Sequence, residues 1–238
     1  MQKQQKMLVV LVALLLACAN LPHHSTTAPE SLEDSLPRDS FVFLLVKEFY
    51  PKCTAESCTA EKSISMGSGF VIDKTKTGSL VMTAAHVCMP EYDKSIMTII
   101  VSDIDDKKYD ASALKWDEKN DLCLLFVEKL KRPALKLSMK APVPGDRLYN
   151  IAAPVGIFNK QMVPILEGRY NGIGYNGSAI YSLVAAPGSS GSMILNYKFE
   201  LVGMIQALHT RFPTITIGPS YKVLKKFITE NAPFYRSL

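Results

Sequence analysis

Short apolar runs separated by turn residues fill most of this chain, and they constrain its fold more than any other feature. The runs lie at residues 41–46, 69–72, 80–82, 97–101, 122–127, 148–152, 162–166, 180–184, 193–195, 201–205 and 214–217. Strands this short and this closely spaced are typical of β-sandwiches and barrels. Near the C-terminus, by contrast, four apolar residues share one helical face: Val223, Leu224, Phe227 and Ile228. The sequence therefore predicts an all-β protein with one terminal helix.

The N-terminal segment differs from the rest of the chain. Met1–Lys6 is polar and basic, and Met7–Ala17 is apolar but too short to span a bilayer comfortably. This pattern predicts a signal peptide at residues 1–18, because a core helix would usually have a polar face. The end of the run resembles a bacterial lipobox, in which Cys18 would carry lipid and attach the chain to a membrane. Simple cleavage stays open as the alternative, since Leu16 is unusual at its position.

Residues 19–40 are rich in Pro, Ser, Thr and acidic side chains, and they lack apolar periodicity. Such a composition predicts a flexible tether between the export signal and the folded body. The whole chain has a formal charge of +5, but its basic residues are scattered and are not interleaved with aromatic ones. Nucleic-acid binding is therefore not expected.

Five cysteines are present, and assigning Cys18 to a lipid leaves an even four: Cys53, Cys58, Cys88 and Cys123. In an exported protein this number favours two disulfides, and the sequence does not choose among the three ways of pairing them. A zinc site is the competing interpretation. It is disfavoured because Cys53 and Cys58 have no CxxC spacing or histidine pair behind them.

Two segments carry side chains suited to acid–base chemistry. The segment 80–86 is an apolar strand that runs through Ala84 and Ala85 into His86, where a histidine could act as general base and then acid. In the segment 117–125, Asp121 directly precedes an apolar strand and could orient an imidazole. Taken singly, each residue is explained as well by a core histidine or a solvated loop acid, and Asp117 is a second candidate in the same loop.

The third segment is Pro187-Gly188-Ser189-Ser190-Gly191. Its glycines allow the backbone to bend, to expose a hydroxyl group and to aim the N–H groups of Gly188 and Ser190 at one point, as in an oxyanion hole. A flexible Gly-Ser loop is the alternative when this segment is considered alone.

In the order His, Asp, Ser, these segments resemble the trypsin-like serine protease family, and most closely its bacterial heat-shock-type branch without a peptide-binding module. The resemblance covers about residues 41–230 and includes Gly67-Ser68-Gly69 in a first-barrel strand. It implies two six-stranded antiparallel β-barrels, at 41–135 and 136–238, the second ending in the terminal helix. It also implies a catalytic triad of His86, Asp121 and Ser190, with Ser190 chosen over Ser189 and Ser192. Two departures are the missing Ile-Val-Gly-Gly activation sequence and the serines on either side of the Ser190-Gly191 pair.

The resemblance further implies a first specificity pocket with Val184 at its base and Gln206, Ala207 and Leu208 along one wall. A pocket whose floor lacks an acidic residue favours small or apolar substrate side chains over Lys and Arg. The function implied is that of a secreted serine endopeptidase, periplasmic or extracellular, that forms an acyl-enzyme on proteins or peptides without metal or cofactor.

Two other functions stay open. A catalytically silent binding protein could use the same fold. A serine esterase is less well supported, because the Gly-x-Ser-x-Gly elbow is absent and apolar runs lie on both sides of Ser190. The sequence does not indicate an oligomeric state.

Overall fold

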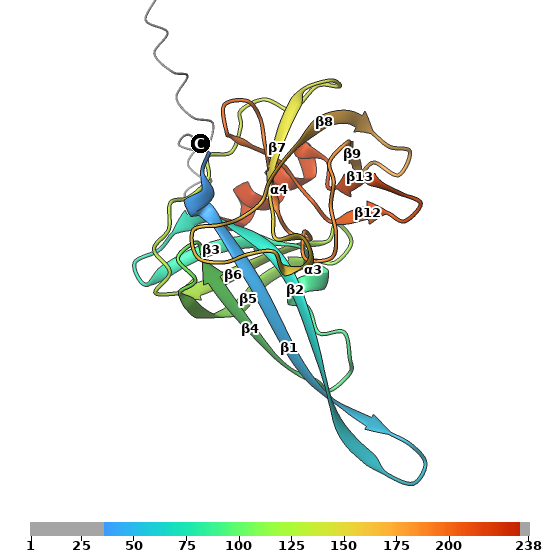
Figure 1. Cartoon of the computed structure of the whole chain (residues 1–238). Coiled ribbons are helices and arrows are strands. Elements are labelled where there is room, and N and C mark those ends of the chain that lie inside the picture. The colour runs from blue at the N-terminus through green and yellow to red at the C-terminus, as the bar shows by residue number, and fades with distance from the viewer. Residues whose placement is uncertain (1–35, 234–238) are drawn as a thin grey trace, which may run out of the picture. The chain divides into compact units, whose positions relative to one another are not determined.

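The computed structural model describes residues 36–233 (Figure 1). The predicted signal peptide, Cys18 and most of the predicted tether lie outside these residues. Within residues 36–233, no helix is long and apolar enough to cross a membrane.

The first half of the described chain is a closed β-barrel in the order β1-β2-β3-β6-β5-β4. Its strands are β1 (Phe41–Cys53), β2 (Cys58–Lys74), β3 (Gly78–Thr83), β4 (Ile96–Asp103), β5 (Lys108–Asp117) and β6 (Leu122–Glu128). The short helix α3 (Ala85–Cys88) follows β3, and the 3-10 turn η1 (Arg38–Ser40) precedes β1. Alternate residues of β1, including Val42, Leu44 and Val46, are buried in the barrel, as the period of a strand requires.

The second half forms a seven-stranded sheet in the order β11-β10-β7-β8-β9-β13-β12. Its strands are β7 (Arg147–Ile151), β8 (Ile165–Ile173), β9 (Ala179–Tyr181), β10 (Met193–Leu195), β11 (Leu201–Met204), β12 (Ala207–His209) and β13 (Phe212–Gly218). The 3-10 turn η2 (Pro154–Gly156) follows β7, and helix α4 (Tyr221–Asn231) follows β13. Buried Tyr181 lies in the apolar cluster of this sheet with Leu148, Tyr170 and Ile194.

The prediction of an all-β fold with a terminal helix is confirmed, and so is the first six-stranded barrel. The second sheet has one more strand than expected and its edge strands β11 and β12 do not pair with each other. Ile205 separates these strands because its N–H and C=O bond to Ser192 and Gly191 rather than to a strand. The strand expected at 162–166 begins at Ile165 instead, since Asn159 and Met162 close a turn before it.

The two pairs of cysteines form disulfides, Cys53–Cys58 and Cys88–Cys123. The first closes the tip of the β1–β2 hairpin, which extends beyond the barrel (Figure 1). The prediction of two disulfides is therefore confirmed, and the structure supplies the pairing.

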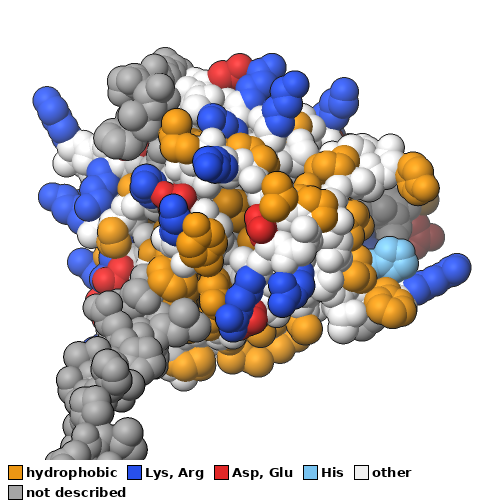
Figure 2. Space-filling view, turned by 90° about the horizontal axis from the view of Figure 1, so that it is seen from above, with side chains coloured by type: hydrophobic (Ala, Val, Ile, Leu, Met, Phe, Trp, Pro, Cys, Tyr) orange, Lys and Arg blue, Asp and Glu red, His pale blue; other side chains and the backbone are white. Residues whose placement is uncertain are grey.

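The molecular surface carries mixed charges. On the face seen in Figure 2, Lys and Arg side chains are spread among acidic and apolar ones, and those described form no single basic patch there. This distribution agrees with the scattered basic residues of the sequence.

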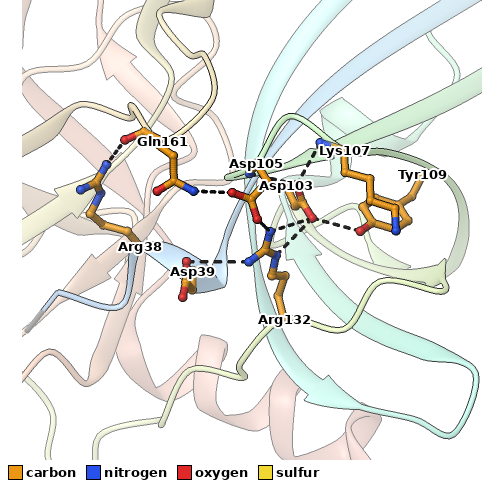
Figure 3. A network of polar contacts seen from close by, with 8 residues as sticks. All are labelled: Arg38, Asp39, Asp103, Asp105, Lys107, Tyr109, Arg132 and Gln161. Atoms are coloured by element: carbon orange, nitrogen blue, oxygen red, sulfur yellow. Dashed lines mark hydrogen bonds and ion pairs between the residues drawn. The ribbon is translucent and has the colours of Figure 1, made fainter. Parts of the chain in front are cut away.

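A polar cluster around Asp103 and Arg132 joins the first barrel to the loop of residues 154–162 (Figure 3). Asp103 is buried and accepts hydrogen bonds from the backbone N–H groups of Asp105 and Lys107, from the Tyr109 hydroxyl and from Arg132. Arg132 also pairs with Asp105, and Asp105 in turn accepts a hydrogen bond from the side chain of Gln161. The cluster thereby anchors Gln161, whose backbone N–H also donates to the carbonyl of Ile104 at 2.7 Å.

The charge of Asp105 depends on this arrangement. A hydrogen bond from Arg132 lowers the pKa of the Asp105 carboxyl group, partial burial opposes this shift, and the hydrogen bond from Gln161 adds to it. Because the pKa in the folded state lies below its usual value, the cluster contributes stability at neutral pH. That contribution is lost as the pH falls through the lowered pKa.

We expect Asp103→Asn to lower the free energy of unfolding by about 3 kcal/mol or more, because it leaves the part-buried Arg132 without its buried charge partner. Urea unfolding at pH 7 measures the change. The control is Glu167→Gln, which breaks the exposed pair of Arg147 and Glu167 and should cost less than about 1 kcal/mol. Equal losses in the two variants would show that the buried pair has no special role in stability.

Candidate active site

His86 and Asp121 lie together because their elements are neighbours in the barrel. Strands β3 and β6 pair with Thr83 opposite Cys123, so the segment after β3 meets the residue before β6. The Nδ1 atom of His86 lies 2.9 Å from Oδ2 and 3.1 Å from Oδ1 of Asp121. The backbone N–H of His86 also donates to Oδ1 at 2.9 Å. A carboxylate at Nδ1 requires a proton there, which leaves Nε2 as the acceptor that a general base needs.

Asp117, the other candidate acid, is hydrogen-bonded to Asn120. Its carboxylate accepts hydrogen bonds from the backbone and side-chain N–H groups of Asn120, at 3.1 and 2.6 Å. It therefore holds the turn that leads to Asp121, and the imidazole pairs with Asp121.

The disulfide Cys88–Cys123 lies two residues beyond each member of this pair. It joins α3 to β6 and so links the histidine segment covalently to the aspartate segment. The pairing of His86 with Asp121 thus rests on a covalent link as well as on strand pairing.

The three serines of the loop at residues 185–192, here called the serine loop, differ in their surroundings. Ser189 and Ser192 are buried, and Ser192 accepts a hydrogen bond from Asn150 at 2.8 Å. Ser190 is part-exposed, and its hydroxyl donates to the main-chain carbonyl of Gln206 at 3.2 Å. Among the described residues, no hydrogen bond joins Ser190 to His86. Burial thus leaves Ser190 as the serine of this loop that solvent can reach.

Ser68 of β2 docks the serine loop against the first barrel. Its N–H donates to the carbonyl of Ser190, and its hydroxyl donates to the carbonyl of Gly188, both at 2.8 Å. The same hydroxyl accepts the N–H of Ala153 at 3.0 Å, and the carbonyl of Ser68 accepts the hydroxyl of Thr83. The hydrogen bonds of Ser68 could not be predicted from the sequence, because its partners are distant along the chain or, like Thr83, lie on another strand.

The N–H groups of Gly188 and Ser190 belong to peptide groups whose carbonyl oxygens, those of Pro187 and Ser189, both accept hydrogen bonds. The carbonyl of Pro187 accepts the N–H of Val155 at 2.6 Å, and that of Ser189 accepts the N–H of Ser192 at 3.0 Å. In a trans peptide the N–H points opposite to the C=O, so these bonds fix the direction of both N–H groups. Neither N–H has an acceptor within residues 36–233. Gly188 has φ of 98°, and an added Cβ would lie 2.5 Å from the carbonyl oxygen of Ala153, which excludes other residues.

The 154–162 loop contacts the first barrel and carries the Val155 N–H group that donates to the Pro187 carbonyl. Gln161 is anchored in the Asp103 cluster, and Phe158 stacks on Phe43 of β1 with ring centroids 5.4 Å apart. Val155, at the other end of the loop, has φ of 48°, a strained value for a β-branched residue. The anchored loop therefore holds Val155 in place to donate to Pro187.

Gln206 connects the two parts of the site. Its carbonyl accepts the Ser190 hydroxyl, and its side-chain NH₂ donates to the carbonyls of Asn120 and Asp121, the latter at 3.0 Å. The sequence predicted Gln206 as part of a substrate wall. In the structure, Gln206 joins the serine loop to the aspartate loop through these two contacts.

A small cavity of about 200 Å³ opens beside Ser190. Its lining includes Gln206, Ala207 and Leu208, the residues predicted along the wall of the specificity pocket, together with Ala185, Ala186 and Ile205. Val184, predicted at its base, does not line it and is about half exposed, because its buried neighbours Leu183 and Ala185 point the other way. No charged side chain lines the cavity. Two larger surface cavities, of about 460 and 590 Å³, contain none of these residues.

A model of the trypsin-like peptidase domain matches residues 67–204, more than half of the chain. The chain belongs to the trypsin-like peptidase family. The match begins at Gly67, next to Ser68, and includes the histidine, aspartate and serine segments.

Known relatives agree with this assignment. A probable periplasmic serine endoprotease, DegP-like, from Hahella chejuensis is 25% identical over 155 residues, which are 63% of this chain and 31% of that protein. The serine endoprotease from Yersinia pestis has a similar fold, with a TM-score of 0.59 at 19% identity over 80% of this chain and 62% of the other. The HtrA-type protease AlgW, solved with a decapeptide, gives 0.67 at 18% identity over 84% and 66%. This chain thus spans about a third of the curated relative and less than two thirds of each solved chain.

We expect removal of the Cys88–Cys123 disulfide by the double substitution Cys88→Ala/Cys123→Ala to lower the free energy of unfolding by about 4 kcal/mol, because it closes a long loop. The pair Cys53→Ala/Cys58→Ala closes a much shorter loop and should cost about 2 kcal/mol. Urea unfolding of both double variants checks the order, and the reverse order would contradict the loop-closure explanation.

We expect Ser68→Ala to cost about 1–3 kcal/mol of stability, since it leaves the buried carbonyl of Gly188 and N–H of Ala153 without a partner. Hydrogen exchange should also speed up in the serine loop. Ser79→Ala is the matched control, because Ser79 is equally buried and donates to the carbonyl of Leu130 at 2.7 Å. Unchanged exchange in residues 185–192 of Ser68→Ala would show that Ser68 does not hold this loop.

Proposed function

We propose that this chain is an exported serine endopeptidase in which Ser190 is the nucleophile, His86 the general base and acid, and Asp121 the residue that orients His86. The observation that carries the proposal is the pairing of His86 with Asp121 beside a loop in which Ser190 is the one accessible serine. Family membership and the curated relative's description as a serine endoprotease support it.

In the proposed reaction, the Ser190 hydroxyl turns from the Gln206 carbonyl toward Nε2 of His86 and loses its proton to that atom. The oxygen attacks the scissile carbonyl carbon and forms a tetrahedral intermediate. The carbonyl oxygen gains negative charge, which the N–H groups of Gly188 and Ser190 stabilise by about 3 kcal/mol per donor. The imidazolium, held by Asp121, then protonates the leaving amine as the C–N bond breaks. Water repeats these steps on the acyl-enzyme and releases the acid.

The uncharged cavity beside Ser190 supports a preference for small or apolar side chains at the residue before the scissile bond. Its lining includes the small residues Ala185, Ala186 and Ala207, and no carboxylate lines it that could select Lys or Arg. Substrates would accordingly be proteins or peptides with Ala, Val or a similar residue at this position.

Export is supported by the apolar N-terminal run, by the two disulfides and by the periplasmic description of the Hahella chejuensis relative. Attachment to a membrane through lipid on Cys18 stays a prediction, because that residue lies outside those described.

One observation favours a second candidate function, that of a catalytically silent binding protein. The Ser190 hydroxyl donates to the Gln206 carbonyl instead of to His86. In that function, peptides would bind the uncharged cavity without being cleaved.

We expect a fluorophosphonate probe to add once to the folded protein at Ser190, and we expect Ser190→Ala and His86→Ala to prevent labelling. Asp121→Asn should lower kcat for peptide cleavage by about 10⁴-fold, because the imidazole then takes the wrong tautomer. Intact-protein mass spectrometry and peptide hydrolysis measure these effects.

The matched control is Asp117→Asn, which alters an acid of the same loop that does not touch His86 and should leave most of the activity. Urea-denatured wild type, which should not be labelled, controls for chemical reactivity. A folded wild type that neither reacts nor cleaves peptides, yet binds them, would establish the silent binding protein instead.

A further inference from the structure

The β1–β2 hairpin projects beyond the barrel and has two unlike faces (Figure 1). Residues directly opposite each other in paired strands share a face of the sheet, and the two faces alternate along each strand. One face, here called the hairpin stripe, consists of the rows Met66–Leu45, Ile64–Lys47, Lys62–Phe49, Ala60–Pro51 and Cys58–Cys53. Strand β4 extends the first three of these rows with Ile100, Thr98 and Ile96.

The hairpin stripe is apolar and exposed. Phe49, Ile64, Met66 and Ile96 have 46, 55, 36 and 73% of their surface exposed. Single apolar residues are common on protein surfaces, whereas a contiguous set of them marks a surface that contacts a partner. The stripe therefore has the character of an interaction surface.

The apolar surface continues from the stripe to the 154–162 loop. A Cβ added to Gly156 would lie 3.2 Å from the sulfur atom of Met66, so the loop and the stripe are in contact there. Val155 and Ile157, on either side of Gly156, are also exposed. The exposed apolar surface is thus larger than the hairpin alone provides.

The charges of the hairpin are divided between its two faces. The rows of the stripe contain Lys47 and Lys62 but no Asp or Glu. The Lys62 ammonium lies 5.8 Å from the centre of the Phe49 ring, so positive charge and apolar surface are adjacent. The acidic residues Glu48 and Glu61 lie on the opposite face. A partner of the stripe would therefore combine apolar surface with negative charge.

The opposite face of the hairpin is partly covered by the chain itself, which holds the stripe in place. Buried Glu48 accepts hydrogen bonds from the N–H groups of Glu91 and Tyr92, and Tyr92 stacks on Tyr50 with centroids 3.6 Å apart. The Cys53–Cys58 disulfide closes the tip. A surface that is already ordered loses little conformational entropy when a partner binds it.

The stripe lies on a projecting element and not in a groove. None of the three cavities described above is lined by Phe49, Ile64, Met66 or Ile96. A bilayer can contact such a surface along its whole length. Apolar side chains then enter the boundary between headgroups and acyl chains, and lysines meet anionic headgroups. Membrane lipid therefore matches both the shape and the charge of the stripe.

The sequence provides a second, independent membrane signal. The lipobox-like end of the N-terminal run predicts lipid on Cys18, and β1 begins at Phe41. The chain between these two residues can span at most about 80 Å, so a lipid anchor would keep the hairpin within reach of the membrane. Stable attachment of a lipidated protein takes two signals, of which a basic surface patch is one kind. The stripe would supply the second signal.

We propose that the hairpin stripe docks the folded body on the surface of a bilayer that contains anionic phospholipid. Phe49, Ile64 and Ile96 enter the boundary between headgroups and acyl chains, and Lys47 and Lys62 pair with lipid phosphate groups. This inference concerns binding alone and does not depend on the proposed peptidase function.

The test measures cosedimentation with vesicles of phosphatidylcholine, either alone or mixed in equal parts with phosphatidylglycerol. The protein is the chain that begins at Ala19, because removal of the predicted signal peptide and Cys18 excludes lipid attachment and leaves the described body whole. We expect at least about tenfold tighter binding to the anionic vesicles, since each lysine near an anionic surface adds to the attraction. Added salt should weaken this binding.

Two pairs of variants locate the contact. Ile64→Ser should weaken binding to the anionic vesicles about tenfold, because it removes an apolar side chain from the stripe. Leu114→Ser is its matched control, because Leu114 of β5 is 54% exposed and lies outside the stripe. Lys62→Glu should weaken binding by about tenfold or more. Lys222→Glu makes the same change of net charge on helix α4 and should have a much smaller effect.

A fluorescent label that senses its surroundings reports the contact directly. A nitrobenzoxadiazole group attached to the Ile64→Cys variant should shift its emission to the blue when anionic vesicles are added, because it leaves water. The same group on the Leu114→Cys variant should not respond.

Failure of the wild type to bind the anionic vesicles would overturn the proposal. So would equal binding of the wild type, Ile64→Ser and Lys62→Glu, or labels that respond alike at the two positions. If Ile64→Ser lowers the sedimentation coefficient without vesicles and leaves vesicle binding unchanged, the stripe pairs two copies of the chain, and the proposal is wrong. A protein that binds the vesicles through the stripe but is not labelled by fluorophosphonate would support docking while contradicting the peptidase function.

Discussion

Ser68 is a buried serine whose hydrogen bonds hold the two β-sheets together at the proposed active site. Its N–H group donates to the carbonyl of Ser190, and its hydroxyl donates to the carbonyl of Gly188. The same hydroxyl accepts the N–H of Ala153, and the Ser68 carbonyl accepts the Thr83 hydroxyl. Ser68, Gly188, Ala153 and Thr83 are buried, so leaving one of their hydrogen-bonding groups without a partner would be costly. Since both Gly188 and Ser190 depend on it, the position of the serine loop relative to His86 depends on Ser68.

Three further contacts complete this arrangement from different directions. Gln206 joins the serine loop to the aspartate loop, and the Cys88–Cys123 disulfide joins that loop to α3. Val155 holds the Pro187 carbonyl and is itself held through the anchored 154–162 loop. Groups that stabilise charge act best when they need not reorganise during the reaction. The contacts around the site therefore matter for the proposed chemistry as much as the three side chains themselves.

The sequence predicts the all-β class, the terminal helix and His86, Asp121 and Ser190 as candidate site residues, because strand periodicity and short motifs are local properties. It could not decide the disulfide pairing, the burial that distinguishes Ser190 from Ser189 and Ser192, or the outward direction of Val184. It also gave no sign of the hydrogen bonds that Ser68 makes, of the link from Gln161 to Asp105, or of the contact of Gln206 with the aspartate loop. These features depend on contacts between residues far apart in the chain, such as Ser68 and Gly188, which are 120 positions apart. Only the packing of one sheet against the other brings such residues within hydrogen-bonding distance.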